Sequence, residues 1–382
     1  MKHNRKIIYL VGFLFSIPIA LTSYVNSTFL KEYMSGSYVS VLYIVASSLT
    51  ILGLLQMPGI LTRLGNRKTS LLLSVVGFFS LIGLALGTNT IVITGSFIVF
   101  FVSSNFLFAS LDIFVKDLSQ ETSIGKSRGL YLMILNLAWV VSQAISGSVV
   151  TKSSFKGLYL LGACFMALVV IIFAKSLHNF IDPKYKKVAI LDTFKVFVKN
   201  KNISKIYLVN FILKFFYVWM IIYTPIYLHE HIGFHWDAIG LIFTVMLLPF
   251  VALTYSLGKL SDKIGEKEFL TLGFIFIAVS TMLIPFITEP SLLIWAGILF
   301  ATRVGAATIE IMSESYFFKN VSKEDPDIIS FFRNTSPLAF ILAPLIAIPV
   351  FIFIPSFEHI FFVLGAILLT GLYVTLRIKD TL

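Results

Sequence analysis

The feature that most constrains this chain is a series of long apolar runs that recurs from one end to the other. A helix of about 20 apolar residues crosses the hydrocarbon core of a bilayer, and only helices or closed barrels satisfy their backbone polar groups there. The runs are continuous rather than alternating, which excludes barrel strands. We therefore predict an all-α membrane protein with twelve transmembrane helices. The expected spans are 7–30, 38–58, 69–87, 90–115, 128–150, 156–177, 204–228, 237–258, 268–287, 290–317, 327–353 and 357–377.

Composition supports this class. Hydrophobic residues make up 57% of the 382 residues and charged residues only 13%, whereas a soluble domain carries about 25% charged residues. One aqueous core could not bury so many apolar side chains. The single cysteine, Cys164, excludes a disulfide framework, and we expect it to be a small buried hydrophobe. The basic N-terminus precedes an apolar stretch without a cleavage site, so we expect an uncleaved first span reaching Leu30.

The net charge of +11 invites a nucleic-acid interpretation, but the positions of the charges argue against it. If both termini are cytoplasmic, 25 of the 30 Lys and Arg residues fall in cytoplasmic segments, and only Lys31, Lys152 and Lys156 fall in external loops. The remaining two, Lys214 and Arg303, lie inside spans. This bias predicts a multi-pass protein of the cell (inner or plasma) membrane, with both termini cytoplasmic, membrane lipid as a partner and no nucleic acid.

The two halves of the sequence resemble each other. Short matches recur at an offset of 198 or 199 residues: 109–113 with 307–311, Asn136 with Asn334, 59–62 with 258–261, and Tyr24 with Tyr223. A six-span unit repeated in parallel predicts two six-helix bundles related by a pseudo-two-fold axis along the membrane normal. We expect the bundles at 1–178 and 204–382, joined by a cytoplasmic linker at 179–203 that carries an amphipathic helix.

The turn after the eighth span carries the most specific motif. It reads Gly258-Lys259-Leu260-Ser261-Asp262-Lys263-Ile264-Gly265-Glu266-Lys267. This resembles the cytoplasmic signature of the major facilitator superfamily (MFS), and the stretch 223–228 is similar to the end of that family's seventh span. The resemblance implies alternating access, with a loop that latches the inner ends of the bundles when the protein is open outward. Independently of the family, the carboxylate of Asp262 can accept hydrogen bonds from a helix N-terminus.

The first copy of this turn, 59–68, departs from the pattern because it is shorter and lacks the acidic position. The resemblance implies that Asp112, near the inner end of the fourth span, pairs instead with Arg63 or Arg67. Its counterpart Glu310 would lie near Lys263 or Lys267. The expected inner gate comprises Gly59, Arg63, Gly65, Arg67, Asp112, Gly258, Asp262, Lys263, Gly265 and Lys267.

Ionisable groups inside spans cost about 2.5–3.5 kcal/mol each, so they are expected to face the interior and to have partners. In one interpretation, Lys214 and Arg303 bind an anionic or zwitterionic group in a central cavity, and Glu310 or Glu314 carries a coupling proton. In the other, these four form buried ion pairs that lock spans 7 and 10 together. Further cavity candidates, for which helix–helix contact is the alternative, are Asn26, Asn136, Gln143, Tyr24, Tyr223 and Trp219.

The sequence thus favours a monomeric, proton-coupled secondary transporter of a small solute, with no cofactor and no metal. A multidrug/proton efflux transporter of the same fold is one alternative, although the fourth span lacks an arginine and the fifth lacks a Gly-Pro pair. A non-transporting receptor or scaffold is another. An enzyme is not expected, because the chain has no phosphate loop and no nucleophile elbow.

Overall fold

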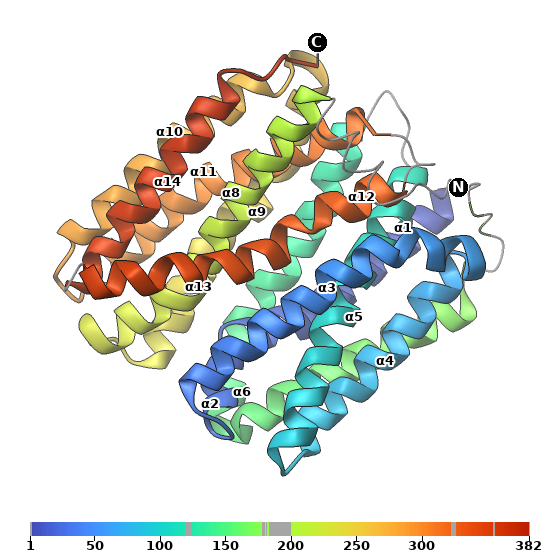
Figure 1. Ribbon diagram of the computed structural model, residues 1–382, viewed down its shortest axis with the longest axis horizontal. Helices are drawn as coiled ribbons and strands as arrows, with labels where there is room; N and C mark the ends of the chain where they lie inside the picture. The colour runs from blue at the N-terminus through green and yellow to red at the C-terminus, as the bar shows by residue number, and fades with distance from the viewer. Residues whose placement is uncertain are drawn as a thin grey trace. The chain divides into compact units, whose positions relative to one another are not determined.

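The computed structural model describes residues 2–118, 124–177, 180, 182, 200–321, 326–353 and 356–381. In these ranges every regular element is a helix, and twelve helical stretches are long and apolar enough to cross a membrane (Figure 1). The prediction of an all-α membrane protein with twelve spans is therefore confirmed. The linker expected at 179–203, with its amphipathic helix, lies almost entirely outside the described residues.

The chain divides into two compact units, each assembled from separate stretches. Unit 1 comprises Met1–Ser119, Ser148–Val196 and Val321–Ile341, and unit 2 comprises Gln120–Gly147, Phe197–Asn320 and Leu342–Leu382. Each unit thus includes one stretch from the other half of the sequence: the fifth span belongs to unit 2, and the start of the eleventh belongs to unit 1. The division into bundles at 1–178 and 204–382 stays a prediction.

Unit 1 is organised around its central helix, α5. Its elements are α1 (Lys2–Ser23), α2 (Asn26–Lys31), α3 (Gly36–Leu64), α4 (Asn66–Leu86), α5 (Thr90–Asp117), the second part of α6 (Ile124–Lys175), α12 (Pro326–Arg333) and the start of α13 (Thr335–Phe353). Helices α1, α3, α4 and α12 all pack against α5, and α12 also packs against α3. At the start of α13, the ring of Phe340 stacks on that of Tyr43, with centroids 5.7 Å apart.

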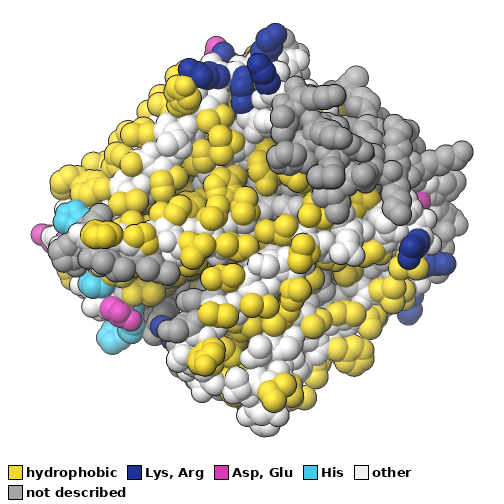
Figure 2. Space-filling view, viewed as in Figure 1, with side chains coloured by type: hydrophobic (Ala, Val, Ile, Leu, Met, Phe, Trp, Pro, Cys, Tyr) yellow, Lys and Arg dark blue, Asp and Glu magenta, His cyan; other side chains and the backbone are white. Residues whose placement is uncertain are grey.

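Unit 2 is organised around α11, which packs against α8, α9 and α10. Its elements are the first part of α6, α8 (Lys201–Ile226), the π-helical turn η2 (Tyr227–His231), α9 (Trp236–Ile264), α10 (Lys267–Leu283), the 3₁₀ turn η3 (Ile284–Phe286), α11 (Leu292–Lys319), the remainder of α13, the 3₁₀ turn η4 (Phe357–His359) and α14 (Ile360–Thr375). Lys and Arg side chains gather at the end of this unit that carries the C-terminus, and His side chains gather at its opposite end (Figure 2).

Three expectations about the helices need correction. The first span does not reach Leu30, because α1 ends at Ser23 and α2 begins at Asn26. The hydroxyls of Thr22 and Ser23 donate to the carbonyls of Pro18 and Ala20 in the preceding turn. The eleventh span divides into α12 and α13 around Asn334. Cys164, expected to be buried, has an exposed side chain.

Helices α6 and α9 approach each other closely at glycines. A Cβ added to Gly125 would lie 2.5 Å from the carbonyl oxygen of Gly258, and one added to Gly129 would lie 2.5 Å from that of Thr254. Small residues let two membrane helices bring their backbones together and increase the van der Waals contact between them. The contact positions the first turn of α6 beside the turn that follows α9.

Gly129→Ala should therefore destabilise the protein by about 1–3 kcal/mol, because the new methyl group meets backbone that has no room to yield. Gly240→Ala on α9 is the matched control, since its Cβ would have no heavy atom within 4 Å. The control should be neutral or slightly stabilising, because Ala is the better helix former. Thermal unfolding of the detergent-purified protein measures both, and equal melting temperatures for the two variants would contradict the close contact.

Candidate functional site

Helix α11 carries three buried charged side chains on one side: Arg303, Glu310 and Glu314. The carboxylate Oε1 of Glu310 lies 3.1 Å from Nζ of Lys214 on α8. The side chains are 11% and 17% exposed, respectively. Lys214 Nζ also lies 5.1 Å from the centroid of the Tyr217 ring. The Lys214–Glu310 ion pair thus joins spans 7 and 10.

One turn along α11, Glu314 forms a second ion pair, with Arg128 of α6. Both side chains are only 1% exposed. The guanidinium carbon of Arg128 lies 4.0 Å from the centroid of the Phe318 ring and 5.5 Å from that of Tyr131. This pair is sealed by aromatic rings, and breaking it by removing one partner would leave a buried charge, a change that typically costs about 3–5 kcal/mol.

Arg303 is 3% exposed. Its guanidinium carbon lies 4.8 Å from the centroid of the Phe216 ring, and Nη1 donates a hydrogen bond of 3.3 Å to the hydroxyl of Thr302. A guanidinium over an aromatic face gains cation–π stabilisation in a desolvated setting. Arg303 thus lies on the same side of α11 as both acidic residues, with its charge held against an aromatic wall.

The other cavity candidates distribute over both units. In unit 2, Trp219 and Tyr223 extend a line of rings along α8, with centroids 5.3 Å apart. The indole Nε1 of Trp219 and the amide Nδ2 of Asn136 are buried without a hydrogen-bond partner among the described residues. Gln143 of α6 is also buried. In unit 1, Asn26 accepts a hydrogen bond of 2.7 Å from the Tyr159 hydroxyl, and Tyr24 lies in the turn between α1 and α2.

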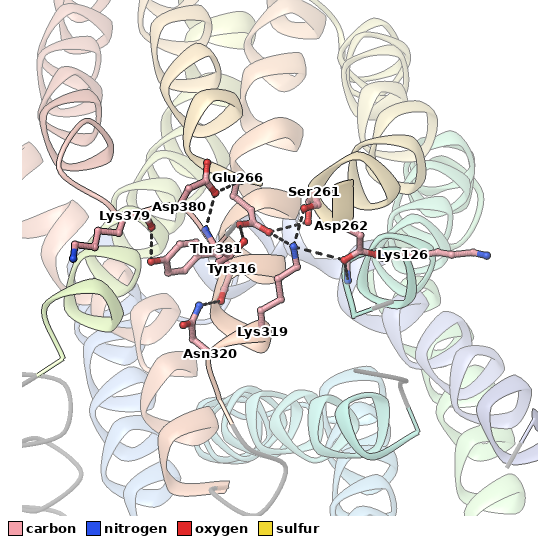
Figure 3. A network of polar contacts seen from close by, with 11 residues as sticks. Lys126, Ser261, Asp262, Glu266, Tyr316, Lys319, Asn320, Lys379, Asp380 and Thr381 are labelled. Carbon is pink, nitrogen blue, oxygen red and sulfur yellow. Dashed lines mark hydrogen bonds and ion pairs between the residues drawn. The ribbon is translucent and has the colours of Figure 1, made fainter. Parts of the chain in front are cut away.

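The turn between α9 and α10 forms a polar network (Figure 3). The carboxylate of Asp262 accepts hydrogen bonds from the backbone N–H groups of Gly125 (2.9 Å) and Lys126 (2.8 Å) in the first turn of α6. The Lys126 side chain points away from the network, so only its backbone takes part. The contact predicted for Asp262, a carboxylate at a helix N-terminus, is present. Nζ of Lys319 lies 2.6 Å from Glu266 and 3.7 Å from Asp262 and so links the two acidic residues.

The same turn holds an aspartate from the segment after the last helix. Asp380 Oδ1 accepts a hydrogen bond of 2.9 Å from the backbone N–H of Glu266, which precedes α10. Unit 1 repeats this arrangement, because Asp182 Oδ1 accepts one of 2.8 Å from the backbone N–H of Asn66, at the start of α4. The preceding glycines, Gly265 and Gly65, have φ of 81° and 75°. A Cβ at either would collide with the aspartate, so both positions require glycine.

At the first turn, Asp112 is paired with Arg333 of α12, a partner that the sequence did not indicate. Nε of Arg67 donates to the carbonyl of Ser176 and Nη2 to that of Phe173, each at 3.0 Å, so Arg67 caps the end of α6. Arg63 is exposed.

The remaining gate candidates differ in their partners and in their exposure. Glu310 pairs with Lys214 and not with Lys263 or Lys267, which corrects the expected partner. Lys263 is exposed, whereas Lys267 is half-buried. A Cβ on Gly59 would meet no heavy atom within 4 Å, whereas one on Gly258 would collide with α6. Gly59 and Gly258, the first glycines of the two turns, therefore differ in how closely another helix approaches them.

The sequence matches the model of the Major Facilitator Superfamily twice, over residues 8–238 and 220–381. The chain belongs to this family. The structure is similar to that of the human organic anion transporter MFSD10 (TETRAN), with a TM-score of 0.77 and 13% sequence identity over 98% of this chain and 99% of that chain. A search of the curated proteins finds no match. The MFS fold and the twelve spans together identify a multi-pass membrane transporter, which also points away from an enzyme.

Sequence reasoning missed the partners rather than the acidic residues. Arg128 and Arg333 were counted among the cytoplasmic cations, because both stand near the ends of spans. Asp182 and Asp380 carried a usable signal, since they are 198 residues apart, the offset of the other repeats in this MFS chain. Nothing in the sequence indicates that the Lys319 side chain reaches the turn after α9.

Asp380→Ala should destabilise the protein by about 0.5–2 kcal/mol, because the backbone N–H at the start of α10 loses its acceptor. Asp380→Asn should lose much less, since an amide oxygen also caps a helix. Thermal unfolding of both variants in detergent measures the difference. If Ala and Asn substitutions lowered the melting temperature equally, the charge of Asp380 rather than its hydrogen bond would be the stabilising feature.

Proposed function

We propose that this MFS transporter is a secondary active transporter that moves a small anionic or zwitterionic solute by alternating access, coupled to protons. It would act as a monomer without a cofactor, in the cell membrane, with both termini in the cytoplasm. The observation that carries the proposal is the Lys214–Glu310 ion pair inside spans 7 and 10, with Arg303 on the same side of α11. The family contributes the transport function, and these residues contribute the preference for negative charge.

The inner gate is supported by contacts that join opposite halves of the sequence. Asp262, after α9, binds the first turn of α6, and Glu314 of α11 pairs with Arg128 of that same helix. In unit 1, Asp112 of α5 pairs with Arg333 of α12. A cavity that opens to the cytoplasm between two bundles would have to separate these partners. Their charge-assisted contacts would therefore favour the state that is closed on that side.

Proton coupling is proposed for the two glutamates of α11. Glu310 and Glu314 are buried carboxylates whose cations come from other helices, so a helix movement that removes the cation favours taking up a proton. The solved structure of similar fold is that of a human organic anion transporter. That name agrees with a positively charged site, although the likeness itself extends to the fold alone.

Replacing the two cations within the spans should impair transport. With the protein reconstituted in liposomes under a pH gradient, Lys214→Ala and Arg303→Ala should each lower kcat/KM for an acidic or zwitterionic solute at least about tenfold, because a hydrogen bond to a charged group is lost. Lys205→Ala, at the start of α8, is the control and should transport normally. Unchanged uptake by both cavity variants would refute the cavity assignment. Binding without any uptake would indicate a receptor instead.

The orientation has its own test. In a Cys164→Ser background, cysteines at Arg63 and Lys263, which are both exposed, should react with an impermeant maleimide only from the cytoplasmic side. A cysteine at Lys31, also exposed, should react only from outside. Labelling of sealed vesicles of both orientations measures this. Reaction of positions 63 and 263 from opposite sides would refute the two-bundle arrangement.

A further inference from the structure

We propose that the end of unit 2 where α8 begins and α14 ends binds the headgroup of an anionic phospholipid. The basic cluster that holds the headgroup consists of Lys201, Arg377 and Lys379, whose side chains are all exposed. Lys and Arg side chains gather at this end of the unit (Figure 2). With both termini in the cytoplasm, as proposed above, the lipid belongs to the cytoplasmic leaflet. The cluster is separate from the charges within the spans, so the site does not depend on which solute is carried.

The three side chains come from segments that contact each other. Helices α8 and α14 pack together, and the ammonium of Lys205 donates a hydrogen bond to the backbone carbonyl of Arg377. Lys201 precedes Lys205 by one turn, on the same side of α8. The segment that follows α14 therefore lies beside the first turns of α8, and the basic cluster forms one patch.

The carboxylates near this end are directed elsewhere. Asp380 accepts a hydrogen bond of 2.9 Å from the backbone N–H of Glu266, and the buried carboxylate of Glu266 pairs with Lys319. Glu268 is exposed at the start of α10 and directly follows a lysine. Among the described residues, none of the three cations forms an ion pair with an acidic side chain. The Lys379 side chain points away from the polar network (Figure 3), so the basic cluster keeps its charge for an external anion.

Arg377 is positioned by an aromatic ring. Its guanidinium carbon lies 4.1 Å from the centroid of the Tyr373 ring, one turn earlier on α14. A guanidinium stacked on a ring keeps the N–H groups at its edge, and these bind phosphate oxygens in pairs. Lys201 and Lys379 add two ammonium groups, which bind phosphate as point charges. This set of donors fits the phosphate of a lipid headgroup.

The apolar side chains next to the basic cluster distinguish a lipid from a soluble phosphate. Leu208 follows Lys201 by two turns on the same side of α8 and is exposed. Tyr373 and Leu369 precede Arg377 by one and two turns on α14, and both are exposed. Both helices thus present a basic end followed by exposed apolar side chains. A phospholipid has the same order, a charged headgroup and then acyl chains, whereas a free phosphate has no apolar part to bury.

Native mass spectrometry of the detergent-purified, full-length protein tests the site. The probes are phosphatidylglycerol and phosphatidylcholine with the same acyl chains, at graded concentrations. We expect phosphatidylglycerol to bind at least about fivefold more tightly, because each Lys or Arg near an anionic headgroup contributes about that factor. Glycerol 3-phosphate in excess should not displace the bound lipid, because it lacks the acyl chains.

Two triple variants with the same change in charge test the location. The cluster variant combines Lys201→Gln, Arg377→Gln and Lys379→Gln. The matched control carries the same substitution at the three cations predicted for external loops, Lys31, Lys152 and Lys156. The cluster variant should lose the preference for phosphatidylglycerol, and the control should keep it.

Substitutions of Tyr373 test the positioning of the guanidinium. Tyr373→Ala should weaken phosphatidylglycerol binding about two- to fivefold, because the cation–π contact is lost. Tyr373→Phe keeps the face of the ring and should bind as the wild type does. Equal binding by the Ala and Phe variants would contradict this role of the ring.

Three results would overturn the inference. Equal binding of the two lipids to the wild type would remove the headgroup site, and loss of the preference in both triple variants would remove its location. Displacement by glycerol 3-phosphate would indicate a site for a free phosphate and not for a lipid. None of these results bears on uptake by the Lys214 and Arg303 variants, so failure of this inference and failure of the proposed function are distinguishable.

Discussion

An ionised side chain that is taken out of water is costly unless a counter-charge lies close by, and this constraint organises much of the interior of the protein. Arg128–Glu314, Lys214–Glu310 and Arg333–Asp112 all satisfy it across helices rather than along one. Such pairs contribute little net stability, because desolvation offsets their attraction, but separating one partner is costly. They therefore define which helices stay together as long as the ion pairs are intact.

The ends of the helices obey a similar rule. The first N–H groups and last carbonyls of a helix lack partners within it, and here charged side chains supply them. Asp262 serves the first turn of α6, Asp380 serves the residue before α10, and Arg67 serves the last carbonyls of α6. Each contact joins segments far apart in the sequence, so these turns link helices that are not consecutive in the chain. Glycine stands at the two positions, Gly65 and Gly265, where a Cβ would collide with the acidic cap.

The sequence predicted the features that depend on local composition. Apolar runs predicted the twelve spans, and the signature turn predicted an aspartate at a helix N-terminus. The sequence did not predict the break after Ser23, because apolar residues continue on both sides of it. The partner of Glu314 was missed for a different reason. Hydropathy indicates that Arg128 stands at the end of a span, but only the packing of the first part of α6 within unit 2 brings it to α11.

The structure shows similarities between the two halves that the short sequence matches did not include. Asp182 and Asp380 accept hydrogen bonds from equivalent backbone N–H groups in the two units, so this helix-capping contact occurs once in each unit. Asp112 and Glu310 also occupy equivalent positions, 198 residues apart, yet their partners are unrelated. The first pairs with Arg333 of α12 and the second with Lys214 of α8. The equivalent carboxylates of Asp112 and Glu310 thus lie in different environments. Asp112 therefore bonds a helix from the other half of the sequence, whereas Glu310 bonds one from its own half.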